Sequence, residues 1–118
     1  MLDIEGLKND VAQCVSLLFS GKLDKIILYG SYARGDYDGE SDIDFMVLAR
    51  CAREELRGYE KKLYSISNRL SLEYDVMISF ILQTSEFFDS WRGVLPLYRN
   101  IIKDGIEVRG YERREGVV

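Results

Sequence analysis

The 118-residue sequence contains no histidine, two cysteines and a single proline. Without histidine, the chain cannot supply a Cys/His zinc site or a histidine general base. Cys14 and Cys51 stand far apart and neither has a cysteine beside it, so we expect both to be small buried thiols. Carboxylates and hydroxyls are therefore the groups on which any chemistry of this chain has to rest.

Long apolar runs are also missing, since no stretch approaches the roughly 20 residues that a membrane-spanning helix needs. Residues 1–5 are acidic and lack the basic-then-apolar layout of a signal peptide. We therefore expect a cytoplasmic protein without a membrane partner. The net charge of −4 offers no basic surface for nucleic-acid phosphates, so non-specific nucleic-acid binding is not expected.

The chain has the length and the composition of one globular domain, with 47% hydrophobic and 31% charged residues. We expect a single domain over residues 1–118 and a flexible charged tail at residues 110–118. Hydrophobic spacings of three and four residues predict long helices, and short apolar or alternating runs predict strands. The expected helices are 4–18, closed by a left-handed Gly21, then 53–71, 85–91 and 96–105; the expected strands are 25–29, 44–48, 73–80 and 106–108.

This order of elements predicts a small α+β (α/β) domain with a mixed β-sheet and helices packed on one side. The connection between the strands at 25–29 and 44–48 is too short for a crossover that contains a long helix. We therefore expect these two strands to be antiparallel.

Two carboxylates open the strand at 44–48. Asp42 and Asp44 are two residues apart, so in an extended chain their side chains point the same way. Like charges that converge in this way repel each other, and a divalent cation is the natural compensation. Carboxylate oxygens combined with substrate phosphates suit Mg²⁺, or alternatively Mn²⁺.

A third carboxylate, Asp75, stands among apolar residues in the expected strand at 73–80. A charge in such a position is costly unless it faces a metal, a partner or water. If this strand lies beside the one that Asp44 opens, Asp75 completes a cluster of three carboxylates. Such a cluster can hold two metal ions, and Asp75 could also act as a general base. The alternative is an edge-strand residue that faces water.

The turn before this site combines Gly30 and Ser31 directly after the strand at 25–29. Glycine permits unusual backbone angles and close approach of a ligand, and a Ser31 hydroxyl with nearby backbone N–H groups can bind phosphate. Arg34 could add a charged fork to the same phosphates. Taken singly, each of these features is more often a simple turn or a surface charge, and their conjunction is what indicates a site.

Gly30-Ser31, ten intervening residues and then Asp42-Ile43-Asp44 resemble the nucleotidyltransferase superfamily typified by DNA polymerase beta, and most closely its minimal nucleotidyltransferases. The resemblance implies a Mg²⁺-dependent transfer of a nucleoside monophosphate from an NTP to a hydroxyl, with release of pyrophosphate. It implies that Asp42, Asp44 and Asp75 are metal ligands and that Gly30 and Ser31 bind phosphate, with Arg34 a weaker match.

Minimal members of this family commonly act with a small helical HEPN protein as an antitoxin–toxin pair. The resemblance therefore implies ATP as donor and a HEPN-type protein as acceptor. Two alternatives stay open: an antitoxin that binds a nucleotide but acts only by complex formation, and an enzyme that modifies a small molecule such as an aminoglycoside. Aromatic residues at 87–91 and 95–98 either cover the sheet or bind a partner, and assembly into an oligomer is possible.

Overall fold

The structure is a computed structural model that describes residues 2–108, so the predicted tail at 110–118 lies outside the described residues. In chain order the elements are α1 (Ile4–Phe19), η1 (Ser20–Lys22), β1 (Leu23–Tyr29), α2 (Ser31–Arg34), β2 (Ile43–Ala49), η2 (Arg53–Leu56), α3 (Arg57–Tyr74), β3 (Ile78–Thr84), α4 (Ser85–Trp91), α5 (Pro96–Asp104) and β4 (Ile106–Glu107). No helix within this part of the chain is long and apolar enough to cross a membrane.

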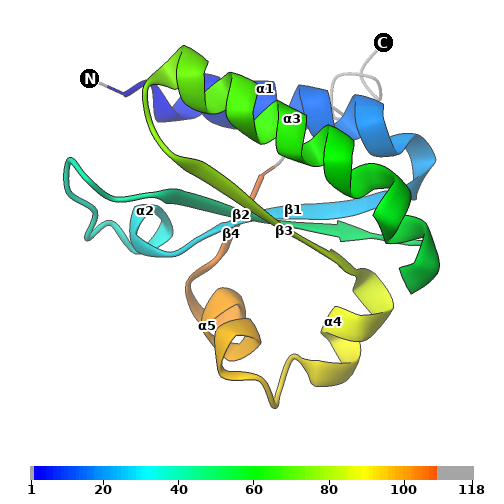
Figure 1. Ribbon diagram of the computed structural model, residues 1–118. Coiled ribbons are helices and arrows are strands. Elements are labelled where there is room, and N and C mark those ends of the chain that lie inside the picture. Colours follow the sequence, from blue (N-terminus) through cyan, green and yellow to red (C-terminus); the bar gives the residue numbers. More distant parts are fainter. Residues whose placement is uncertain (1, 109–118) are drawn as a thin grey trace, which may run out of the picture.

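The strands form one four-stranded sheet in the order β3-β2-β1-β4 (Figure 1). β1 pairs antiparallel with β2 and with β4, whereas β2 and β3 run parallel and α3 makes the connection between them. The mixed sheet, the α+β class and the antiparallel relation of the first two strands are thus confirmed.

The helices cover both faces of this sheet (Figure 1): α1 and α3 lie on one face, and α4 and α5 lie on the other. This corrects the expectation that the helices pack on one side. The reason lies in β2, which is apolar on both faces. Phe45 and Val47 belong to the cluster under α1 and α3, whereas Met46 and Leu48 belong to the cluster under α4 and α5. A strand with this pattern needs cover on each side.

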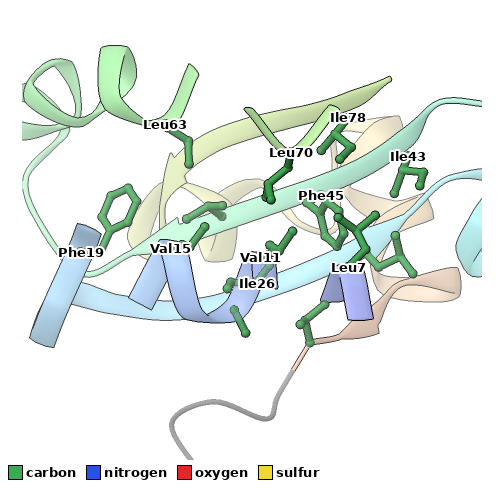
Figure 2. Close-up of a cluster of buried hydrophobic side chains, with 14 of the residues drawn as sticks. Leu7, Val11, Val15, Phe19, Ile26, Ile43, Phe45, Leu63, Leu70 and Ile78 are labelled. Carbon is green, nitrogen blue, oxygen red and sulfur yellow. The ribbon is translucent and has the colours of Figure 1, made fainter. Parts of the chain in front are cut away.

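The larger core lies between the α1–α3 layer and the sheet (Figure 2). It is made of side chains at helical spacing on α1 that meet the inward residues of β1, β2 and α3. Burying each of its large aliphatic or aromatic side chains contributes roughly 1.5–3 kcal/mol. The fully buried members include Leu7, Val11, Val15, Phe19, Phe45 and Leu70.

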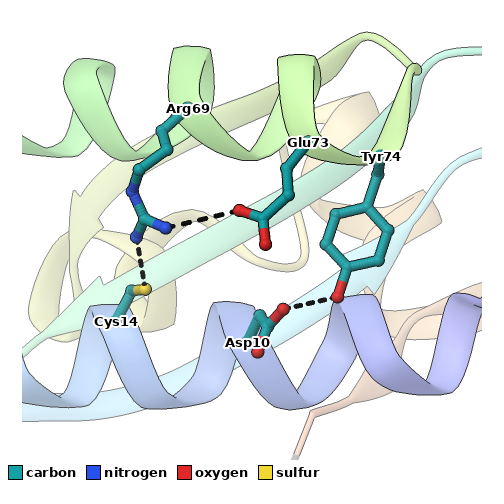
Figure 3. A network of polar contacts seen from close by, with 5 residues as sticks. All are labelled: Asp10, Cys14, Arg69, Glu73 and Tyr74. Atoms are coloured by element: carbon teal, nitrogen blue, oxygen red, sulfur yellow. Dashed lines mark hydrogen bonds and ion pairs between the residues drawn. The ribbon is translucent and has the colours of Figure 1, made fainter.

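The last turn of α3 is fixed to α1 by polar contacts (Figure 3). The Tyr74 hydroxyl donates a hydrogen bond to the Asp10 carboxylate, and the Arg69 guanidinium donates to Cys14 Sγ at 2.9 Å while it pairs with Glu73 at 3.5 Å. These contacts keep the chain helical as far as Tyr74. The expected strand at 73–80 is therefore wrong in its first half, and β3 begins only at Ile78.

Two smaller expectations also need correction. Ser20, not Gly21, has the left-handed φ after α1, at 55°. Cys14 and Cys51 are half-buried rather than fully buried. The short helices and the last strand are confirmed, with Pro96 at the first turn of α5 and Gly105 as its C-cap.

Candidate active site

The turn after β1 is built around two glycines. Gly30 has φ 81° and begins α2, where its carbonyl accepts the N–H groups of Ala33 and Arg34, each at 3.1 Å. Gly35, with φ 87°, ends the helix, and its N–H donates to the carbonyl of Ser31 at 2.9 Å. Such φ values favour glycine because other residues pay a steric cost there. The predicted Gly-Ser turn into a short helix is therefore present.

A compact turn then leads the chain into β2. The Asp38 carboxylate accepts the Glu40 N–H at 2.9 Å and the Ser41 hydroxyl at 3.2 Å, and the Asp38 N–H donates to the Ser41 hydroxyl at 2.9 Å. Asp42 follows directly, exposed and one residue before the strand, and Asp44 is the second residue of β2 and half-buried.

Gly30 and Asp44 lie against each other. A β-carbon added at Gly30 would stand 2.8 Å from Oδ2 of Asp44, closer than real side chains come. Glycine at position 30 therefore allows the Asp44 carboxylate to lie close to the backbone of the turn. The Gly-Ser turn and the second carboxylate form one local unit.

The electrostatics of the pair fit a cation. Partial burial and the neighbouring Asp42 charge raise the pKa of Asp44 above the usual carboxyl value. Both effects penalise the ionised form, and a divalent ion would remove both penalties at once. Mg²⁺ prefers one or two carboxylates together with substrate phosphates, and Asp42 and Asp44 offer that donor set.

Two further residues lie beside Asp44, and neither was among the predicted site residues. Tyr29 is its partner across the β1–β2 ladder, and Ser79 is its neighbour in β3. Burial and the Asp44 charge raise the pKa of Tyr29 to about 12, so its hydroxyl stays protonated and can only act as a neutral hydrogen-bonding group at working pH. The alternation of side chains along β1 could have predicted that Tyr29 lies beside Asp44. The same prediction for Ser79 requires knowing where β3 begins.

Arg34 occupies the last position of α2, and its Nε lies 3.1 Å from Oδ2 of Asp36. The guanidinium is on the same short helix as Ser31 and is half-exposed. The Ser31 hydroxyl makes no hydrogen bond within residues 2–108. Both groups thus lie on the helix that starts beside Asp44.

Asp75 stands apart from the pair. It is the C-cap of α3 in left-handed conformation, with φ 55° and ψ 49°, and it lies outside β3. Its side chain lines a separate hollow of about 630 Å³, together with Tyr32 and Tyr37, whose rings stack at 4.1 Å. Over the described residues, no three His, Cys, Asp or Glu side chains gather as a metal site. The expected position of Asp75 in mid-strand is therefore corrected.

The late aromatic residues cover the sheet. Phe88 and Tyr98 are buried against Met46 in the second core cluster, with ring centroids 4.8 Å apart. Phe87 packs beside Tyr98 and Trp91, of which Trp91 is the most exposed, at 43%. A role for this group in binding a partner stays a prediction.

A mixed sheet that holds a Gly-Ser turn against a carboxylate pair defines a nucleotidyltransferase-type domain. Residues 8–108 match the family model described as nucleotidyltransferase domain, and the chain belongs to that family. The chain is 44% identical over 81 residues to the Methanocaldococcus jannaschii protein named "Putative protein adenylyltransferase MJ0141", which covers 69% of this chain and 80% of that protein. A second protein of the same description and organism, MJ0604, is 33% identical over 90 residues, or 74% and 79% of the two chains.

Solved structures with the same fold include a toxin–antitoxin crystallised with AMP-PNP, at 20% identity and a TM-score of 0.57 over 93% of this chain and 78% of that one. They also include the MNT antitoxin in complex with the tri-AMPylated HEPN toxin of Shewanella oneidensis, at 18% identity and a TM-score of 0.54 over 96% and 77%. The resemblance to minimal nucleotidyltransferases is thus confirmed at the level of family, and the chain is an adenylyltransferase-like enzyme.

Proposed function

We propose that this enzyme is a Mg²⁺-dependent protein adenylyltransferase that transfers AMP from ATP to a hydroxyl of a HEPN-type partner, as the antitoxin of a toxin–antitoxin pair in the cytoplasm. The observation that supports this most directly is the contact of Gly30 with Asp44, because it joins a phosphate-binding turn to a metal-binding carboxylate pair. The description of the M. jannaschii relatives as protein adenylyltransferases supports the type of acceptor.

In this proposal Asp42 and Asp44 hold Mg²⁺, or Mn²⁺ in its place, and the metal neutralises charge on the phosphate oxygens when it is bound. The Ser31 hydroxyl donates a hydrogen bond to the phosphates. Arg34 exchanges the Asp36 carboxylate for a phosphate oxygen, with which its guanidinium can form the same kind of charge-assisted, bidentate hydrogen bonds. Asp44 lies on β2 and Asp42 one residue before it, whereas Ser31 and Arg34 lie on the short helix that starts beside Asp44.

The reaction joins the acceptor oxygen to the α-phosphorus of ATP and breaks the bond to pyrophosphate, which leaves. The acceptor hydroxyl loses its proton as this bond forms, either to water or to Asp75, the residue predicted as general base. Because Asp75 caps α3 outside β3, it can join Asp44 only if the turn between α3 and β3 changes its conformation. An Asp75→Asn variant therefore distinguishes proton transfer to Asp75 from proton transfer to water.

The test is an incubation of the purified chain with a HEPN-type protein encoded beside it, Mg²⁺ and each NTP in turn, followed by intact mass measurement of both proteins. We expect AMP additions on the partner with ATP, and none after Asp42→Asn or without Mg²⁺. Glu40→Gln is the matched control, because it removes an exposed carboxylate from the same loop but not from the pair. Undiminished transfer by Asp42→Asn would disprove the assigned role.

One observation favours the alternative of an antitoxin that acts by binding alone. Among residues 2–108 no third acidic side chain joins the carboxylate pair in a group that could hold a metal ion, whereas the sequence predicts three such ligands. Co-expression with the partner separates the two functions. If Asp42→Asn suppresses the partner's toxicity as fully as the unaltered chain does, binding is sufficient; if suppression is lost while the complex still forms, catalysis is required.

A further inference from the structure

β3 is an edge strand of unusual length and composition for an open edge. It is seven residues long, contains no charged residue and no proline, and within the described part of the chain it pairs with β2 alone. Its two end residues are buried and the five between them are half-buried, whereas β2 is buried almost throughout. The opposite edge, β4, has only two residues. Proteins usually protect an open edge by charge, proline or short length, and β3 has none of these protections.

The backbone of β3 shows which groups this edge presents. The Ile43 N–H donates to the Met77 carbonyl at 2.9 Å, so in a parallel ladder residues 79, 81 and 83 direct their backbone groups toward β2. Residues 78, 80, 82 and 84 therefore direct theirs to the open side.

At both ends of this open side, side chains form hydrogen bonds with the backbone groups of β3. The Ile78 N–H donates to Ser71 Oγ at 3.0 Å, and its carbonyl accepts the Ser67 hydroxyl at 2.5 Å. The Thr84 N–H donates to Gln83 Oε1 at 2.9 Å. Between these ends, the N–H and C=O groups of Phe80 and Leu82 have no partner within residues 2–108. Four adjacent backbone groups thus remain available for a strand from outside.

A groove follows the same edge between α3 and β3. It consists of two hollows of about 510 and 660 Å³ that share Glu60 and Leu82 as lining residues. Tyr64 and Met77 line the first hollow and are 68% and 60% exposed, respectively. Apolar exposure beside unpaired backbone groups is typical of a surface that binds another chain.

We infer that a second copy of this chain covers the edge, with the two β3 strands antiparallel around a two-fold axis at Ile81. In an antiparallel pair, alternate residues exchange both of their backbone hydrogen bonds. An axis at Ile81 pairs Phe80 of each copy with Leu82 of the other, which gives four hydrogen bonds and uses all eight open groups. The two sheets become one sheet of eight strands, and no group of the edge is left over.

The charges along the groove are self-complementary in this arrangement. Arg57 lines the end of the groove near Gln83, Tyr64 and Asn68 line the other end, and Glu60 lies between them in both hollows. Neither Arg57 nor Glu60 takes part in an ion pair with any described residue. Antiparallel packing brings the Arg57 end of each copy toward the Tyr64–Asn68 end of the other, so each arginine lies opposite Asn68 and Tyr64 of the second copy, with the Glu60 carboxylate of that copy next along the groove. The same chain thus supplies both halves of the contact.

The arrangement also reaches the active site. Ser79 is the neighbour of Asp44 in β3, and an axis at Ile81 pairs Ser79 with Gln83 of the second copy. Cross-strand partners share one face of a sheet. The second copy therefore adds an amide side chain to the row that runs from Asp44 through Ser79, a contribution that none of residues 2–108 of a single copy makes at this edge.

Sedimentation velocity and backbone hydrogen exchange over a hundredfold range of concentration test this inference on the complete chain. We expect a dimer at the higher concentrations, with the Phe80 and Leu82 amides becoming protected at least tenfold as it forms. A monomer at all concentrations, or a dimer in which these two amides exchange as in the monomer, would overturn it. Protection that appears only when the HEPN-type protein is added would overturn it too, because the partner would then occupy the edge.

Variants separate strand pairing from general destabilisation. Leu82→Pro removes an N–H group that does not bond to β2, and edge strands tolerate proline at such positions. Because the dimer would lose two hydrogen bonds, the dimer dissociation constant should rise roughly tenfold or more. Arg57→Glu and Glu60→Arg should each weaken the dimer, and the doubly substituted chain should regain most of the loss. Lys62→Glu is the control for charge reversal on α3, since Lys62 does not line the groove. If the exchanged charges gave no recovery, or if Lys62→Glu weakened the dimer equally, the proposed contact would be wrong.

Discussion

Gly30, directly after β1, and Asp44, near the start of β2, lie so close that a side chain at position 30 would displace the Asp44 carboxylate. A β-carbon there would lie 2.8 Å from Oδ2 of Asp44, and the backbone φ of 81° disfavours any residue other than glycine. The contact fixes the turn that would bind phosphate relative to the carboxylate that would bind metal. Pre-organisation of this kind is what transfer between two bound groups requires.

Substituting Gly30 tests that contact. Gly30→Ala should lower AMP transfer at least tenfold, because the methyl group displaces the Asp44 carboxylate, and it should lower the free energy of unfolding by about 1–3 kcal/mol through backbone strain. Gly35→Ala is the matched control, since Gly35 has φ 87° but no atom within 4 Å of an added β-carbon. It should show the strain without the loss of transfer. Equal transfer rates for the two variants, measured at equal folded fractions, would contradict the argument.

Asp44 makes the folded chain sensitive to pH and to metal. Because its pKa is raised, the folded state binds more protons than the unfolded state between the unfolded carboxyl pKa and the raised value. Without metal, this term therefore favours folding at low pH and is lost as the pH rises through the raised pKa. Asp44→Asn should accordingly increase stability at pH 7, by about 1 kcal/mol or less.

Thermal unfolding from pH 4 to pH 8, with and without Mg²⁺, measures this effect. Mg²⁺ should raise the melting temperature of the unaltered chain and of Glu40→Gln, and it should leave that of Asp44→Asn unchanged. The Mg²⁺ effect should fade as the pH falls, because protons compete for the same carboxylate. If Asp44→Asn were less stable than the unaltered chain, burial and the Asp42 charge would not determine how Asp44 contributes to the free energy of unfolding.

Local patterns in the sequence are sufficient to predict much of this fold. The three- and four-residue spacing of α1, the Pro96 and Gly105 signals around α5, and the short link between β1 and β2 each depend on neighbouring residues only. The Gly-Ser turn into a short helix is equally local. These are the parts that sequence analysis predicted correctly, whereas the alignment of the Asp42 side chain with that of Asp44 stays a prediction.

The end of α3 depends on distant residues and was missed for that reason. Tyr74, Val76 and Ile78 alternate as a strand would, but Tyr74 also continues the helical stripe of Leu63 and Leu70. In the structure Tyr74 is the last residue of α3, and its hydroxyl donates a hydrogen bond to Asp10, 64 residues away in the chain. With the helix continued to Tyr74, Asp75 lies outside the strand and Ser79 is the neighbour of Asp44. Cover on both faces of the sheet, by contrast, could have been predicted from the continuous apolar run of β2.

Asp75 can be separated from the pair by substitution. Asp75→Asn should fold normally, because asparagine also accepts the left-handed conformation at the end of α3, and it should keep AMP transfer within about twofold of the unaltered rate. Asp42→Asn is the reference for a lost ligand. Single-turnover rates at saturating Mg²⁺ and ATP make the comparison. A loss after Asp75→Asn as large as that after Asp42→Asn would mean that the turn rearranges and brings Asp75 to the metal.

Two serines of α3 hold the first residue of β3, and their removal should be measurable as lost stability. Ser67 is buried and donates its hydroxyl to the Ile78 carbonyl, and Ser71 accepts the Ile78 N–H. Ser67→Ala leaves a buried carbonyl without its partner and should lower the free energy of unfolding by about 1–3 kcal/mol, with a smaller loss for Ser71→Ala, which is less buried.

Urea unfolding at 25 °C is the measurement, and Ser65→Ala, at an exposed position on the same helix, is the control. The midpoint should shift with an unchanged slope if only stability changes. Because both serines hold one residue, the double variant should lose less than the sum of the single losses. A Ser67→Ala midpoint equal to that of Ser65→Ala would mean that the Ile78 carbonyl finds another donor, and β3 would then be anchored by apolar packing alone.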